Sequence, residues 1–272
     1  MSNQIIKSQW RRKAFFSLFI IFAIFLLFSC RPPDFQLELQ QAMTDAVSGQ
    51  LESALHTSSR CLQAAPDNMD ALALNNYCLY MLNNDKATTD KVLFSMERAI
   101  VQNPKRFDLQ YFYGWMLYRQ GKYPEAIEAL EAAYALLPES AARHNRDTRG
   151  NLLFMMGRSC MRSNLPRGMG YLQAARAYEP FAEWPELYNG LAILSLQQEK
   201  WEEAASWLLT GLRQEPNHPS LLRNLAVVYD NYLNRKDLAS QYYEQTLTVL
   251  DYSDHKTRAA INAKLAQLQP RQ

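Results

Sequence analysis

The sequence is poor in the residues that build metal centres and disulfide frameworks. Its 272 residues include only four cysteines and four histidines, and no two cysteines are spaced as C-x2-C. The histidines fall in separate parts of the chain, at His56, His144, His218 and His255. Zinc sites gather such ligands at close, regular spacing. A zinc site is therefore not expected, and we predict no metal and no cofactor.

Signatures of catalysis are also missing. The stretch Gly168-Met169-Gly170 lacks the third glycine of a dinucleotide loop, and Gly121-Lys122 has no glycine at the Walker spacing. Spaced carboxylates fall on amphipathic helices, where a solvated face is expected; they are Glu125, Glu128, Glu131, Glu202 and Glu203. We predict no catalytic residues, no small-molecule substrate and a protein that is not an enzyme.

Neither sign of charge dominates the chain. It has 29 Lys and Arg against 27 Asp and Glu, a formal charge of +2. Four of the basic residues, and no acidic residue, lie within residues 1–29, so the remainder carries 25 against 27, a charge of −2. Proteins that bind nucleic-acid backbones cluster Lys and Arg. We find no such patch and expect no nucleic-acid partner.

Residues 1–29 form a segment of a different kind. A basic start, which ends at Lys13, precedes the apolar run AFFSLFIIFAIFLLF, and this order predicts a secretory signal. The last two residues of this run begin the segment Leu27-Phe28-Ser29-Cys30, which resembles the bacterial lipobox, although Phe28 is bulkier than that pattern prefers. The resemblance implies cleavage before Cys30 and lipidation of Cys30. An uncleaved anchor helix is the alternative, but the run is shorter than the ~20 residues of a spanning helix.

After residue 34 one pattern recurs. Five prolines each follow a small residue by five positions, and further residues at eight and twelve positions before the proline complete a helical stripe. The prolines are Pro66, Pro104, Pro138, Pro180 and Pro216. Small residues let a neighbouring helix come close, and proline ends the helix. Another small residue about 24 positions before the proline, such as Gly114 or Gly157, marks a preceding helix. Each unit is therefore a helical hairpin.

These residues resemble the tetratricopeptide repeat (TPR), whose pattern is W-x2-L-G-x2-Y, A-x3-F, a small residue and P. The unit at 107–140 matches best, through Tyr113, Gly114, Leu117, Ala126, Leu130, Ala133 and Pro138. The resemblance implies an all-α fold, a right-handed superhelical solenoid of about six hairpins with a C-terminal capping helix. We expect a signal peptide at 1–29 and a lipidated Cys with a short Pro linker at 30–34. The repeat array then covers 35–253, as 35–68, 69–106, 107–140, 147–182, 185–218 and 219–253, before a capping helix and tail at 254–272.

Two smaller features follow from this register. Ser253 or Asp254 can cap the last helix, whose apolar stripe is predicted to contain Ala260, Ile261, Leu265 and Leu268. If Cys30 is lipidated, Cys61, Cys78 and Cys160 remain. We expect them to be small buried side chains, while a single bond between Cys61 and Cys78 stays open.

The resemblance also implies a binding groove, because the first helices of TPR hairpins line the concave face. Its groove positions hold many Tyr, Trp and Arg residues, the types that dominate interface hot spots. The candidate residues are Tyr77, Tyr80, Tyr111, Trp115, Tyr118, Arg119, Phe154, Arg158, Arg162, Asn189, Arg223 and Asn231, and Asp230 occupies a further groove position. The alternative is that the rings simply pack between helices.

Together these features predict an exported TPR lipoprotein of the bacterial cell envelope that acts as an interaction scaffold or assembly adaptor. Its partners would be a protein or peptide of the envelope and, through the N-terminal lipid, the membrane. Arg31 after the cysteine favours the outer membrane, facing the periplasm. The alternative is an accessory component or hydrolytic enzyme of cell-wall remodelling with an unrecognised site.

Lipidation of Cys30 is directly testable. We expect mass spectrometry of the membrane-bound form to show a diacylglyceryl-modified cysteine at the N-terminus. Cys30→Ser should remove that modification, while Cys160→Ser should leave it in place. A membrane-bound chain that still begins at Met1 would contradict the prediction and support the anchor helix.

Overall fold

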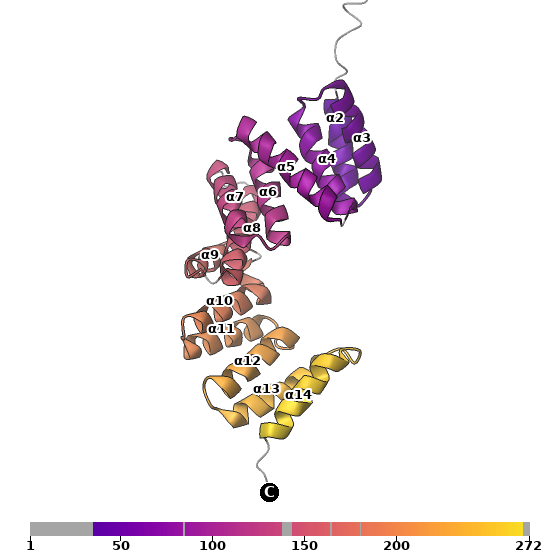
Figure 1. Ribbon diagram of the computed structural model, residues 1–272. Coiled ribbons are helices and arrows are strands. Elements are labelled where there is room, and N and C mark those ends of the chain that lie inside the picture. The colour runs from indigo at the N-terminus through magenta and orange to yellow at the C-terminus, as the bar shows by residue number, and fades with distance from the viewer. Residues whose placement is uncertain (1–34, 84, 138–142, 164, 180, 269–272) are drawn as a thin grey trace, which may run out of the picture. The chain divides into compact units, whose positions relative to one another are not determined.

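The structure, a computed structural model, describes residues 35–83, 85–137, 143–163, 165–179 and 181–268. Within them the regular structure is helical: thirteen α-helices, α2 to α14, and one short 3-10 helix, η1 (Figure 1). No helix among these residues is long and apolar enough to cross a membrane. Cys30 and the apolar run before it lie outside the described residues.

The helices form two compact units. The boundary between the units falls after Ser95, within α5 (Lys86–Gln102). In the first unit, α2 (Gln36–Val47) packs on α3 (Leu51–Ala64), and α3 packs on α4 (Met69–Leu82). Its core contains two of the cysteines, Cys61 and Cys78, which are free and fully buried.

The second unit is a stack of helical hairpins that follow one another in chain order (Figure 1). The hairpins are α6 (Phe107–Arg119) with α7 (Tyr123–Leu136), α8 (Arg143–Arg162) with α9 (Gly168–Ala175), α10 (Pro185–Gln197) with α11 (Trp201–Gln214), and α12 (Pro219–Asn231) with α13 (Lys236–Val249). The 3-10 helix η1 (Phe181–Glu183) precedes α10, and α14 (His255–Leu268) closes the stack against α13. The first helices α8, α10 and α12 also touch one another in turn.

The predicted stripes are the contact surfaces of the second helices. Their six sets of three residues are all buried: Ala54, Ser58, Cys61; Val92, Met96, Ala99; Ala126, Leu130, Ala133; Gly168, Leu172, Ala175; Ala204, Leu208, Gly211; Ala239, Tyr243, Thr246. Two glycines of the first helices, Gly114 and Gly157, face the middle residue of a stripe. A Cβ on Gly114 would lie 2.8 Å from Leu130, and a Cβ on Gly157 would lie 2.3 Å from Leu172. The fold prediction is confirmed: each described unit is a TPR-like α-solenoid.

The repeat pattern did not reveal the backbone conformation of the hairpin turns. In four hairpins, the residue two places before the second helix has positive φ. Two of these residues are Gly49 and Gly121, but Glu199 (φ 60°) and Asn234 (φ 49°) occupy the same place. A left-handed residue at the end of a helix lets the chain reverse. The turn geometry is therefore kept even where the sequence does not use glycine.

The fourth hairpin departs most from its predicted form. Helix α8 begins at Arg143, before the predicted start of the unit at 147, and α9 ends at Ala175, five residues before Pro180. Tight turns from Ala177 to Ala174 and from Tyr178 to Ala175 end α9, so a proline does not end it directly.

Three smaller expectations can be compared with the structure. Asp254 does cap α14, because its Oδ1 accepts the Thr257 backbone N–H at 3.1 Å. Ala260 is exposed, however, and only Ile261, Leu265 and Leu268 of the predicted stripe reach the core. Cys160, like the other two described cysteines, is free and buried as expected.

One carboxylate predicted to be solvated, Glu131, is instead only partly exposed and bonded. It forms an ion pair with Arg167 at 3.1 Å and accepts a hydrogen bond from the Tyr171 hydroxyl. Burial, together with this bond to Glu131, raises the pKa of Tyr171 to about 12. Glu131 therefore links α7 to α9, the second helix of the next hairpin.

The crossing of α8 and α9 can be tested with two glycine substitutions of opposite expected sign. Gly157→Ala places a methyl group against Leu172. Overpacking of this kind costs ~1–3 kcal/mol, more than the ~1 kcal/mol that alanine contributes to helix propensity. Gly170→Ala is the control, because nothing lies within 4 Å of the added Cβ, and it should be neutral or stabilising. Urea and thermal melts followed by circular dichroism should separate them; equal midpoints would contradict this packing.

The end of the stack depends on one buried carboxylate. Asp230 in α12 has a side chain only 5% exposed and lies 2.6 Å from Lys236 Nζ and 3.2 Å from Lys264 Nζ. Burial alone would raise the pKa of Asp230, but the hydrogen bonds and charges of the two lysines lower it overall. The same carboxylate thus joins α12, α13 and α14.

We expect Asp230→Asn to destabilise the end of the stack by ~1–3 kcal/mol at neutral pH, since both lysines lose a charged partner. Because the folded pKa of Asp230 is lowered, its contribution is present above the unfolded pKa of about 3.9 and is lost as pH falls through the folded pKa. The parent and the variant should therefore converge in melting temperature on acidification. Asp237→Asn, at an exposed position nearby, is the control; a constant difference at every pH would exclude this role.

Candidate binding groove

Helix α6 presents three aromatic side chains on one face. Tyr111, Trp115 and Tyr118 are four and three residues apart, which places them on one side of a helix. All three are only partly buried and pack against the edge of the main core of the second unit. Their helix is fixed from behind, where Gly114 meets Leu130 of α7. The repeat packing therefore turns these rings towards α8.

The rings line a hollow of about 400 Å³, which we call the aromatic slot. Its lining residues come from α6, α8 and the residue before α10: Tyr111, Trp115, Tyr118, Arg119, Asn151, Phe154, Met155, Arg158 and Trp184. Six of the twelve residues predicted for the groove are among them. The slot can accept an apolar side chain, because rings and a methionine form most of its wall.

The slot is held in shape by contacts between its own walls. Asn151 donates a hydrogen bond of 2.8 Å from Nδ2 to the Tyr111 hydroxyl, which links α8 to α6. Burial raises the pKa of Tyr111 although the bond from Asn151 opposes that rise. The Tyr111 hydroxyl therefore stays protonated at neutral pH.

Two arginines lie over rings of the slot. The guanidinium carbon of Arg119 lies 5.1 Å from the Trp115 ring centre. That of Arg158 lies 5.7 Å from the Tyr118 ring and 5.6 Å from the Phe154 ring. Such a contact orients the guanidinium of Arg158 and leaves its N–H groups at the edge available for a partner.

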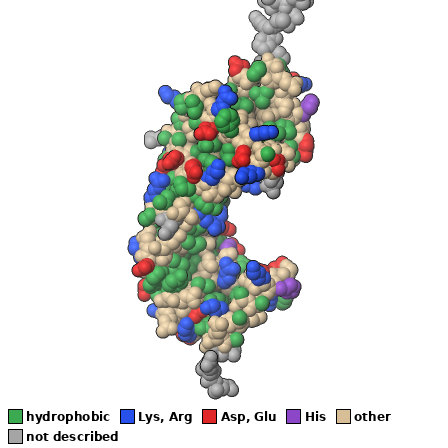
Figure 2. All heavy atoms as spheres, viewed as in Figure 1, with side chains coloured by type: hydrophobic (Ala, Val, Ile, Leu, Met, Phe, Trp, Pro, Cys, Tyr) green, Lys and Arg blue, Asp and Glu red, His purple; other side chains and the backbone are tan. Residues whose placement is uncertain are grey.

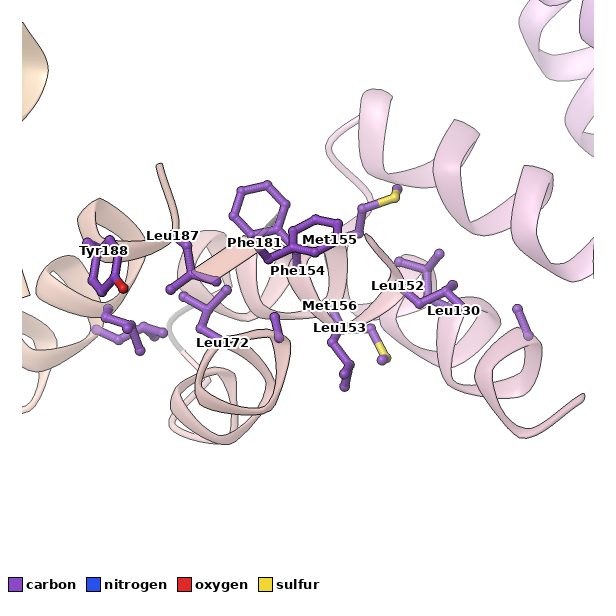
Figure 3. Close-up of a cluster of buried hydrophobic side chains, with 14 of the residues drawn as sticks. Leu130, Leu152, Leu153, Phe154, Met155, Met156, Leu172, Phe181, Leu187 and Tyr188 are labelled. Carbon is purple, nitrogen blue, oxygen red and sulfur yellow. The ribbon is translucent and has the colours of Figure 1, made fainter. Parts of the chain in front are cut away.

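The third wall of the slot contains residues that the groove positions did not predict. Trp184 contacts Phe154 edge-to-face at 5.5 Å and Phe181 at 4.5 Å. Figure 3 shows Phe154 and Phe181 side by side within the core cluster. Phe154 is itself only 6% exposed, so it acts more as the floor of the slot than as a contact surface. Trp184 precedes α10 and occupies none of the groove positions of the repeat. The only sequence signal for its role in the slot is the linker FAEWPE, which is rich in aromatic residues.

Two further hollows continue the slot in opposite directions. One, of about 600 Å³, shares Tyr111, Asn151 and Trp184 with the slot and adds mainly Asp108, Asp147 and aromatic residues of α6. The other, of about 420 Å³, shares Arg158 and lies between α8 and α10; it is lined also by Met161, Arg162, Glu186, Asn189, Gly190, Ile193 and Gln197. Because lining residues are shared, the three hollows form one groove along the first helices α6, α8 and α10.

The remaining predicted residues lie elsewhere. Tyr77 and Tyr80 belong to the first unit, where Tyr77 is half-buried and Tyr80 is 8% exposed, too enclosed for an open contact surface. Arg223 and Asn231 are exposed on α12 but line none of the three hollows. Asp230 is buried in its ion pairs with the two lysines. The structure thus groups eight of the twelve residues, the six of the slot with Arg162 and Asn189.

The described residues give no sign of a metal centre, since no three His, Cys, Asp or Glu side chains among them are placed to hold an ion. On the face in view in Figure 2, basic and acidic side chains are interspersed, without a broad basic patch.

Comparisons with known proteins agree with the fold. A family model for the tetratricopeptide repeat matches residues 95–141, and a model for the coatomer epsilon subunit matches residues 171–269. A search of curated proteins finds no match. Each family model covers less than half of the chain. The solved structures described next cover more of it.

Several solved structures share the fold at low sequence identity. YrrB, a TPR protein with an unusual peptide-binding site, has a TM-score of 0.58 at 17% identity, over 76% of this chain and 97% of YrrB. Pseudomonas aeruginosa pilF has a TM-score of 0.62 at 15% identity, over 84% and 96%. The C-terminal part of a TPR protein from Cytophaga hutchinsonii has 0.60 at 16% identity, over 86% and 96%. The chain therefore has the fold of TPR proteins.

Proposed function

We propose that this protein is an exported, membrane-anchored scaffold or assembly adaptor of a bacterial cell envelope, and that the groove along α6, α8 and α10 binds a segment of a partner protein. The observation that carries the proposal is the aromatic slot with its two ring-stacked arginines. Tyr, Trp and Arg are the residue types most enriched among interface hot spots, where rigid side chains bury area at low entropic cost.

The form of the groove supports binding of a chain segment. Three connected hollows over the first helices of three successive hairpins suit an extended or helical peptide better than a compact small molecule. YrrB, whose fold is similar, is described as having a peptide-binding site. The alternative of a cell-wall hydrolase is not favoured, because such chemistry needs polar groups that converge in an enclosed pocket, whereas rings dominate the slot.

The anchor is supported by the sequence alone. The basic start, the apolar run and the order Leu27-Phe28-Ser29-Cys30 support lipidation, and Arg31 supports delivery to the outer membrane. Four residues separate Cys30 from Phe35, so the link reaches at most ~14 Å. An adaptor on so short a link would hold its partner close to the bilayer.

The groove assignment is tested by removing one anchor from each wall. We expect Trp115→Ala combined with Arg158→Ala to retain helical content and to lower partner capture from solubilised envelope at least tenfold, since a hot-spot loss is ~2 kcal/mol or more. The matched control is Trp207→Ala in α11 with Arg176→Ala at the end of α9, a similar pair with its guanidinium 5.2 Å from the ring. Quantitative mass spectrometry of captured proteins gives the comparison.

The proposal fails if the groove variant captures every partner as well as the parent does. It also fails if the control variant loses the same partners to the same degree, because the effect would then come from general loosening of the stack.

A further inference from the structure

The hollow between α8 and α10 contains two arginines that no carboxylate of the described part of the chain neutralises. Arg158 and Arg162 are four residues apart on α8, and both line this hollow. Among the described residues, no carboxylate lies within ion-pair distance of either guanidinium. The one acidic residue in the lining, Glu186, is 59% exposed and lies 3.8 Å from His218 Nε2 instead.

Neutral donors and acceptors surround these arginines. The Oδ1 of Asn189 accepts a hydrogen bond of 2.6 Å from Asn224 Nδ2, which leaves the Asn189 NH2 group as a donor on the α10 wall. Gln197 Nε2 donates to the Met161 carbonyl at 2.9 Å and is thereby fixed. Guanidinium and amide N–H groups that face one hollow match a carboxylate, which only accepts hydrogen bonds.

The opposite end of the groove is lined by carboxylates, and no arginine or lysine is among its lining residues. Asp108 and Asp147 line the hollow beyond the slot, and Asp108 is already bonded to Arg106 at 2.7 Å from Nε. An acidic ligand group is therefore disfavoured there and favoured beside Arg158. The aromatic slot lies between the two ends and shares Arg158 with the cationic one.

We infer that the groove recognises an acidic–apolar segment within a partner protein: an Asp or Glu side chain in the Arg158–Arg162 hollow, and next to it an apolar or aromatic side chain in the aromatic slot. This inference rests on the proposed function and specifies its partner. Charge complementarity sets the direction of the segment, with its acidic residue on the α10 side of the slot. Arg158 contacts both sites, since its guanidinium stacks on Phe154 and Tyr118 and keeps its N–H edge for the carboxylate.

The test uses peptides, selected on the full chain in detergent micelles from a displayed library of random 12-residue sequences. Selected peptides are made with acetylated and amidated ends, so that no terminal charge contributes, and their binding is measured by fluorescence anisotropy. For each peptide, one version replaces Asp and Glu by Asn and Gln, and another replaces them by Lys. We expect the selected sequences to combine an acidic residue with a neighbouring apolar one, and the Asn/Gln version to bind at least about tenfold more weakly.

Charge reversal of the protein gives the decisive comparison. Arg158→Glu with Arg162→Glu should bind the acidic peptide at least about tenfold more weakly and should bind the Lys version more tightly than the parent does. Arg158→Gln with Arg162→Gln should bind the acidic and Asn/Gln peptides equally, which separates charge from packing if the Glu variant is less stable. Arg213→Glu with Lys256→Glu changes the net charge equally at exposed positions outside the groove, and should leave binding unchanged.

The outcomes distinguish this inference from the proposed function. If selected peptides lose affinity with Trp115→Ala but bind equally well without their acidic residues, the groove binds peptides and the acidic preference is wrong. If only peptides with a free C-terminal carboxylate bind, the occupant is a chain end and the inference is again wrong. If no selected peptide depends on Trp115, both the inference and the proposed function fail.

Discussion

The structure depends on the close approach of two helices within each hairpin. Buried stripes such as Ala126-Leu130-Ala133 and Gly168-Leu172-Ala175 let the partner helix lie almost in backbone contact. Where Gly157 faces Leu172, there is no room for a single methyl group. Tight packing of this kind leaves few alternative arrangements, because cores are close-packed and respond to one extra carbon. The position of α6 relative to α8, and hence the width of the slot, follows from these crossings.

Much of the fold could be predicted because this constraint is local in sequence. Small residues at fixed spacing indicate where two helices cross, and a proline indicates where a helix ends. The prediction was weakest where other interactions replace the pattern. At Asn76, which stands in place of a small residue, a side-chain hydrogen bond to Ser95 at 3.0 Å fills the crossing. The left-handed turn at Glu199 could not be inferred from residue type, because the hairpin imposes that conformation.

The groove was only partly predictable, for a related reason. Repeat positions identify which side chains leave the inner face of a first helix, and they placed Tyr111, Trp115 and Arg158 on it. Repeat positions do not show how far neighbouring helices bury a side chain, so they did not indicate that Tyr80 is enclosed. They also omit residues between hairpins. Trp184 completes the slot from such a segment, and its place depends on its ring contact with Phe181, a contact absent from the repeat pattern.

The rigidity of the stack bears directly on the binding that we propose. A flexible arginine loses rotamer entropy when it binds a partner, and this loss opposes association. Arg119 and Arg158 already rest on aromatic rings, and Asn151 already fixes Tyr111 across the slot. Part of the ordering is thus achieved when the chain folds, so that a partner meets a surface prepared for it. The helix crossings that stabilise the repeats therefore also strengthen recognition, because they hold the aromatic and cationic groups in place before the partner arrives.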